Sequence, residues 1–227
     1  MVVSQHATEC MIFSYRQYQT ENLVEFGGAQ INFSSRFKFL GVTIDNDLSF
    51  RSHIDVILKK ISKSAGILYR IRNCLPISTR LNFYYAFIYP YITYNIEIWG
   101  KTHLYLLDSL FKTQKRVVRT ITGTAFSDHT SPIFKELKIL KVFDVFKYVV
   151  CCHMYKLNNV ESFGVPHNYG TRYRNLPRTS RHRLATCQKA LSFTGPTEWN
   201  NLPNYLREIR TFNSFKKNLK TFLIDQY

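Results

Sequence analysis

The feature that most constrains the fold is a change in hydrophobic spacing near residue 54. From there the apolar residues recur every three or four positions, which places them on one face of a helix. Pro76 ends this run because proline lacks a backbone donor. On a helical wheel of ~100° per residue, Lys59, Lys63 and Arg70 fall within roughly 40° of one another, opposite the stripe. The stripe consists of Ile54, Ile57, Ile61, Ala65, Leu68 and Leu75.

Five later patterns also predict helices, with short connections typical of antiparallel neighbours. Pro90 is expected to kink the first of them and Gly123 to end the second. The apolar segment at residues 83–99 is short and contains Asn95 and Glu97, so it predicts a buried helix and no membrane span. The five helices are expected at residues 78–99, 104–121, 132–140, 142–157 and 214–225.

The helix expected at residues 104–121 also has a basic face. Its apolar stripe begins at Leu104 and ends at Ile121. A row of cations opposite such a stripe suits the neutralisation of successive phosphates in nucleic acid. A solvated helix face would produce the same pattern without a ligand. The face holds Asp108 together with four cations, Lys112, Lys115, Arg116 and Arg119.

The N-terminal 50 residues have a different pattern, rich in β-branched and aromatic side chains. We expect two short strands, at residues 10–14 and 37–44, with Gly41 inside the second. Asp45 and Asp47 follow, and we interpret them as turn or cap residues, although two carboxylates at this spacing could share a divalent ion. The expected fold is mainly α: a small β-hairpin, a helical bundle, and a basic region of loops or short strands with a terminal helix.

The charge is strongly asymmetric. The formal net charge is +16, yet residues 1–50 carry three basic and five acidic side chains. A positive field of this size predicts a polyanionic partner, with nucleic acid first and an anionic membrane surface second. Residues 162–197 contain no acid, and their tyrosines either stack on bases or pack internally. Pro166, Pro177 and Pro196 indicate loop or short strand there. The basic residues of this segment are Arg172, Arg174, Arg178, Arg181, Arg183 and Lys189.

Several kinds of site are not indicated. The sequence lacks the phosphate-loop, dinucleotide, zinc-protease and serine-hydrolase motifs. Cys151, Cys152 and His153 are consecutive and point to different sides of a helix, which disfavours a shared metal. Five cysteines without a CxxC pair indicate no disulfide framework. Together with a polar N-terminus, they favour an intracellular location, nuclear or cytoplasmic.

The run from Phe37 to Asp45 resembles the end of the palm domain in reverse transcriptases of non-long-terminal-repeat (non-LTR, LINE-type, jockey-like) retrotransposons. In that family a Phe/Tyr-Leu-Gly-Val strand forms the primer grip, and a helical thumb follows. Later pieces match in order: Tyr84 with Tyr89-Pro90-Tyr91 and Tyr94, Trp99-Gly100, Gln114-Lys115-Arg116-Val117-Val118-Arg119, Pro132 with Phe134 and Leu137, Asn168-Tyr169 with Thr171-Arg172, Trp199-Asn200-Asn201-Leu202-Pro203, and Phe215-Lys216.

This resemblance implies three parts: a palm-tail β segment at residues 1–50, a helical thumb-like domain at 51–158, and a basic C-terminal region at 159–227. It implies a module that binds a primer–template duplex, RNA or RNA–DNA, with an upstream palm and fingers polypeptide as a possible second partner. The phosphate contacts would be the two helix faces with Arg172 and Arg174. The primer-grip residues would be Phe39, Leu40 and Gly41.

The sequence also departs from the family. Polymerisation there requires three palm aspartates, two of them adjacent, to hold two metal ions. No Asp-Asp pair occurs in this chain, and Asp45 and Asp47 follow the primer-grip strand. We therefore expect no polymerase activity from the chain alone, and no cofactor, with Mg²⁺ only where a palm domain is supplied. The oligomeric state is not indicated.

Three alternatives remain open at this stage. The chain could work as an RNA-directed DNA polymerase by pairing with a separately encoded palm. It could be a degenerate retrotransposon fragment that still folds. It could also be a helical interaction protein whose charge serves solubility or an acidic protein partner.

Overall fold

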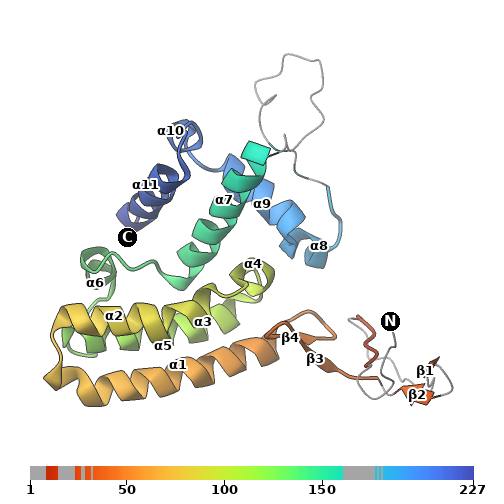
Figure 1. Cartoon of the computed structure of the whole chain (residues 1–227), viewed down its shortest axis with the longest axis horizontal. Helices are drawn as coiled ribbons and strands as arrows, with labels where there is room; N and C mark the ends of the chain where they lie inside the picture. The colour runs from red at the N-terminus through yellow and green to blue at the C-terminus, as the bar shows by residue number, and fades with distance from the viewer. Residues whose placement is uncertain are drawn as a thin grey trace. The chain divides into compact units, whose positions relative to one another are not determined.

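The structure is a computed structural model that describes residues 9–14, 24–26, 29–31, 33–160, 177, 179 and 181–227 (Figure 1). The chain divides into two compact units, Met1–Val56 and Ile57–Tyr227. One helix, α1 (Arg51–Ile71), begins in the first unit and continues into the second. The mainly helical fold with a small antiparallel hairpin near the N-terminus is confirmed.

The first unit contains two antiparallel strand pairs. β1 (Val24–Phe26) pairs with β2 (Ala29–Ile31), and β3 (Arg36–Phe39) pairs with β4 (Val42–Asp45). Cys10, in the first expected strand, forms only an isolated bridge to Phe33.

The single strand expected at residues 37–44 is wrong, because it is a hairpin that turns at Leu40 and Gly41. Phe39 pairs with Val42, and the two loop residues have φ values of 44° and 84°. Positive φ at both central positions defines a type I′ turn, whose twist matches that of the flanking strands. Gly41 therefore lies in the turn, and not within a strand.

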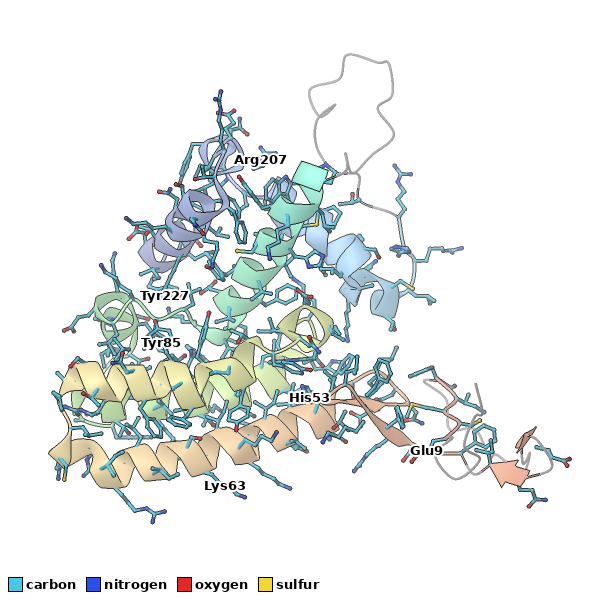
Figure 2. All side chains as sticks on the ribbon, viewed as in Figure 1. Glu9, His53, Lys63, Tyr85, Arg207 and Tyr227 are labelled. Carbon is cyan, nitrogen blue, oxygen red and sulfur yellow. The ribbon has the colours of Figure 1, made fainter. Side chains whose placement is uncertain are left out.

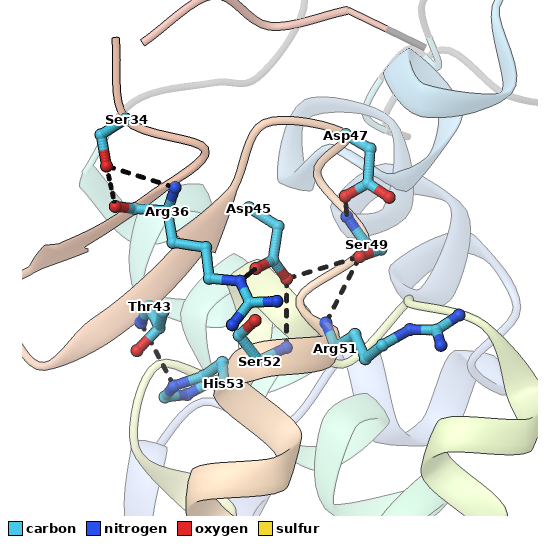
Figure 3. A network of polar contacts seen from close by, with 9 residues as sticks. All are labelled: Ser34, Arg36, Thr43, Asp45, Asp47, Ser49, Arg51, Ser52 and His53. Atoms are coloured by element: carbon cyan, nitrogen blue, oxygen red, sulfur yellow. Dashed lines mark hydrogen bonds and ion pairs between the residues drawn. The ribbon is translucent and has the colours of Figure 1, made fainter. Parts of the chain in front are cut away.

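The start of α1 is held by the two aspartates that follow β4 (Figure 3). Asp45 Oδ2 accepts a hydrogen bond from the Ser52 backbone N–H at 3.1 Å. Asp47 Oδ1 accepts one from the Ser49 N–H at 3.0 Å. These bonds satisfy donors that have no partner within the helix, so the turn-and-cap interpretation is confirmed. Arg36 Nε lies 3.7 Å from Asp45 Oδ1, which ties β3 to the same carboxylate.

In its described part the second unit contains helices and their connections, without a strand. The helix expected at residues 78–99 is three helices. The first break is at Ile88, and the second follows because Tyr94 is extended and Asn95 adopts a left-handed φ of 49°. Pro90 lies in the first turn of the middle one, where proline is tolerated. The helices after α1 are α2 (Ile77–Phe87), α3 (Tyr89–Thr93), α4 (Ile96–Trp99), α5 (Leu104–Thr122), α6 (Ser131–Glu136), α7 (Val142–Val160), α8 (Ala185–Lys189), α9 (Leu191–Asn200), α10 (Asn204–Arg207) and α11 (Phe212–Asp225).

The loop expected around residue 190 is also wrong, because α8 and α9 occupy it. Pro196 lies inside α9 and is buried with Gly195. A Cβ on Gly195 would come within 2.7 Å of Met154 Sδ on α7, so the two helices approach closely at this glycine. Tertiary packing thus outweighs the local preference of proline. The rest of this expected loop, residues 162–176, 178 and 180, lies outside the described residues.

Helix α7 is the centre of the second unit, where it contacts α3, α4, α5, α9 and α11. Its Tyr155 ring stacks on Phe215 of α11 at 4.6 Å between centroids and meets Trp199 of α9 edge-on. No helix in the described ranges is long and apolar enough to cross a bilayer.

A buried amide links α5 to α2 and to the start of α7. Gln114 Nε2 donates to the Tyr84 hydroxyl and to the Leu140 carbonyl, both at 2.9 Å. Its Oε1 accepts from the Val142 N–H at 3.1 Å. Every polar atom of this side chain therefore has a partner, as a buried amide requires.

Replacing this amide should destabilise the protein. Gln114→Leu leaves the Leu140 carbonyl and the Val142 N–H buried without a partner, so we expect a loss of about 2–4 kcal/mol in the free energy of unfolding. Urea denaturation followed by circular dichroism measures it. Ser109→Ala on the exposed side of the same helix is the control, with an expected change under about 0.5 kcal/mol. Equal losses for both variants would contradict the assignment.

Two glycines should respond in opposite ways to alanine. A Cβ on Gly100 would lie 2.5 Å from both the Ile96 carbonyl oxygen and Phe146 Cδ2, so Gly100→Ala should cost about 1–3 kcal/mol. Gly66, inside α1, has nothing within 4 Å, so Gly66→Ala should stabilise by about 0.5–1 kcal/mol. Thermal unfolding of both variants checks the sign, and a stabilised Gly100→Ala would refute the close α4–α7 contact.

Candidate nucleic-acid interface

The basic face predicted on α1 lies on the surface. Lys59, Lys63 and Arg70 are all exposed, while Ile61 and Leu68 on the opposite side are buried. Figure 2 shows Lys63 projecting from the outer side of α1. None of the three cations forms a hydrogen bond or ion pair with a described residue. This face therefore carries positive charge that no ion pair neutralises among the described residues.

The basic face of α5 divides into two kinds of residue. Lys112 and Arg116 are exposed and make no ion pair within the described part of the chain. Lys115 is half-buried, with its Nζ 4.4 Å from the centroid of the Phe111 ring. Arg119 donates to the Asp128 carbonyl at 2.8 Å. Lys112 and Arg116 are thus the better candidates for contacts with a ligand.

The apolar stripe of α5 begins later than predicted. Leu104 is 71% exposed, whereas Leu107, Leu110 and Ile121 are buried. Leu104 is the first helical residue, after His103 at the N-cap, so nothing in the preceding turn covers it. Gly123 ends the helix with a φ of 78°. Glycine is favoured at this position because it adopts the left-handed conformation without a steric penalty.

One surface residue was missed by the helical pattern. Phe126, in the turn after α5, is 79% exposed, and the Arg119 guanidinium carbon lies 5.2 Å from its ring centroid. Asp128 closes this turn by accepting from the Ala125 N–H at 3.0 Å. The only sequence signal was an apolar ring inside a polar loop, which hydrophobic periodicity does not detect.

The predicted primer-grip residues form the exposed tip of the β3–β4 hairpin. Leu40 is 72% exposed and Phe39 56% exposed. The ring of Phe39 lies 6.5 Å from that of Phe37, two residues earlier on β3. A non-glycine residue with positive φ, such as Leu40, is uncommon and costs roughly 1–2 kcal/mol. The hairpin therefore presents apolar side chains to solvent at some conformational cost.

The cations predicted in the basic C-terminal region are only partly described by the structure. Arg172 and Arg174 lie outside the described residues. Further along, Arg181 and Arg183 are exposed next to α8.

No group of three or more histidine, cysteine or acidic side chains that could hold a metal occurs among the described residues. Burial raises the pKa of the Cys151 thiol strongly and that of Cys152 to about 11, so both thiols are protonated at neutral pH. His153 points elsewhere, with Nδ1 3.7 Å from Glu97 Oε2.

Comparisons with known proteins support the resemblance to reverse transcriptases of non-LTR retrotransposons. The RNA-directed DNA polymerase from the mobile element jockey of Drosophila melanogaster is 29% identical over 141 residues, which is 60% of this chain and 15% of that polymerase. The jockey polymerase of Drosophila funebris is 29% identical over 133 residues, 56% of this chain and 14% of its own length.

A third relative is the probable RNA-directed DNA polymerase from the X-element of Drosophila melanogaster, 28% identical over 113 residues, or 47% of this chain and 12% of that protein. No family model and no solved structure matches the chain. The matched stretches are therefore a small fraction of the relatives' length. By this similarity the chain is related to part of the reverse transcriptase of non-LTR, LINE-type retrotransposons.

Proposed function

We propose that the chain is a nucleic-acid binding module of a reverse-transcriptase-like protein, and that it holds a primer–template duplex without carrying the polymerase active site. The observation that carries this proposal is the pair of basic helix faces. Lys59, Lys63 and Arg70 on α1, with Lys112 and Arg116 on α5, are exposed and lack carboxylate partners among the described residues.

The spacing along each helix suits a phosphate backbone. Residues four apart on one face, such as Lys59 and Lys63, are ~6 Å apart along the helix axis. Such contacts bind the backbone and fix the position of the duplex without reading its sequence. The binding free energy should then be mostly electrostatic and strongly dependent on salt.

The hairpin tip supports the same function. Phe39, Leu40 and Gly41 would lie near the primer end, since exposed apolar side chains on a short turn can pack against a terminal base pair or sugar. A positive φ retained at Leu40 fits a functional position, because strained residues persist where their side chain is needed.

Nucleotide addition is not part of the proposed role. The family's reaction requires adjacent aspartates, and this sequence contains no such pair. A palm polypeptide with those carboxylates would be the second partner, and Mg²⁺ would be required only with it.

Removing one cation from each helix should weaken duplex binding in a defined way. For Lys63→Ala combined with Arg116→Ala, we expect the slope of log K against log salt to become shallower by about 0.9 for each lost phosphate contact. Fluorescence anisotropy with a labelled RNA–DNA duplex, from about 50 to 200 mM salt, measures this slope.

The matched control is Lys135→Ala combined with Lys147→Ala. It removes the same formal charge from lysines that pair with Asp225 and Asp144. An unchanged slope in the first double variant, or equal changes in both, would exclude these helix faces as the binding surface.

The hairpin turn allows a separate test. Asn-Gly is a preferred type I′ turn sequence, so Leu40→Asn should stabilise the protein by about 1 kcal/mol. If Leu40 contacts the primer end, the same variant should bind a recessed primer–template more weakly while its affinity for a blunt duplex stays unchanged. Urea denaturation and competition anisotropy measure the two quantities. Unchanged binding of both duplexes would exclude Leu40 from the interface.

A further inference from the structure

A second basic surface lies on α11 and the elements it packs against, apart from the faces on α1 and α5. It contains four lysines from three separate parts of the chain: Lys138 after α6, Lys156 on α7, and Lys216 and Lys220 on α11. None of the four forms an ion pair with a described residue. The acid of α11, Asp225, lies 4.0 Å from Lys135 instead.

Aromatic rings connect these lysines into one row. Lys156 Nζ and Lys216 Nζ lie 5.0 and 5.5 Å from the centroid of the same ring, Phe212. Lys216 and Lys220 are four residues apart and therefore share one side of α11. Lys220 Nζ lies 3.4 Å from the Tyr85 hydroxyl of α2. The row thus crosses from α7 over α11 to α2.

Tyr85 fixes the end of this row. Figure 2 labels it on the side of α2 nearest α6. Its hydroxyl donates to the Lys138 carbonyl at 3.3 Å and faces the Lys220 ammonium group. Lys138 has a φ of 52°, so its backbone is held in a conformation that non-glycine residues rarely adopt. The hydroxyl oxygen can meet only one of the three ammonium donors of Lys220.

The gathering of these lysines is unfavourable in the free protein. Partial burial, together with the nearby Lys138 charge, lowers the pKa of Lys220. Burial raises the pKa of the Cys152 thiol to about 11, and the positive charges of Lys216 and Lys156 oppose this rise. An anion bound along the row would relieve the repulsion and supply acceptors for the remaining donors.

We infer that Lys138, Lys156, Lys216 and Lys220, with Tyr85, form a second anion-binding surface that takes the phosphate backbone of a nucleic-acid strand. The inference rests on the proposed function and adds a surface to it, formed by the C-terminal helix. Lysines with an aromatic neighbour are the residues that track a backbone without reading sequence. These contacts would suit a duplex and a single strand equally, so both are tested.

The test compares two double variants of the full chain. Lys216→Gln with Lys220→Gln removes two members of the row, and Arg210→Gln with Lys217→Gln removes two exposed cations from the same region. We expect only the first pair to make the salt slope shallower, by about 1.8 units for a DNA duplex or about 1.4 for a single strand. Equal slopes for both pairs, or no change, would overturn the inference.

Lysine acetylation followed by mass spectrometry supplies an independent readout on the unmodified protein. Oligonucleotide should protect Lys220 and Lys216 several-fold more than Lys217. Equal protection by polyglutamate would overturn the inference in favour of an acidic protein partner. A further double variant on α5, Lys112→Gln with Arg116→Gln, separates the two surfaces. If the salt slope responds to this α5 variant but not to Lys216→Gln with Lys220→Gln, the proposed function stands and the α11 surface is refuted. If it responds only to the α11 variant, the chain still binds nucleic acid, but the α5 face is excluded and the α11 surface is supported.

Discussion

The arrangement of the second unit depends on how the buried chain between α6 and α7 satisfies its backbone groups. Leu140 and Val142 are buried there, so their carbonyl and N–H need partners from the protein. Gln114 supplies both, and the Tyr227 hydroxyl accepts from the Lys141 N–H at 2.8 Å. Three consecutive residues are thereby fixed by side chains from α5 and from the far end of the chain. This sets where α7 begins, and α7 in turn supports α9 and α11.

The same constraint orients the basic face of α5. Gln114 is inside the protein, and Lys112 and Arg116, two residues before and after it, lie about 160–200° away around the helix (~100° per residue). Burying the amide therefore directs these two cations to solvent. Lys115 and Arg119 lie nearer the edge of that face, where Phe111 and the Phe126 turn engage them. Local contacts within α5 and its turn thus decide which cations are available.

Much of the fold followed from periodicity, because repeated apolar spacing fixes which side of a helix is buried. α1, α5, α7 and α11 were predicted within a few residues, and the exposure of Lys59 and Lys112 followed with them. The errors arose in segments whose secondary structure is determined by an unusual backbone conformation or by a tertiary contact. The type I′ turn at Leu40 has no asparagine to indicate it, and Pro196 is helical because α9 packs on α7. The Lys220–Tyr85 contact joins residues 135 apart, so no local pattern could predict it.

The positive field of the molecule comes from its 31 Lys and Arg against 15 Asp and Glu, and the positions of the acids determine which cations lack an ion pair. Within the described residues Asp45 and Asp47 cap the start of α1, and Asp128 closes the turn after α5. Glu198 and Asp144 each pair with a neighbouring lysine. Because these carboxylates act in caps, turns and other ion pairs, they form no ion pair with the lysines of α1, α5 and α11. The unpaired positive charge on several helices attracts anions. This attraction is long-ranged at low salt and is screened beyond ~8–10 Å at physiological salt. A polyanion can contact many of these cations along its length, whereas a small anion can contact only one or two of them.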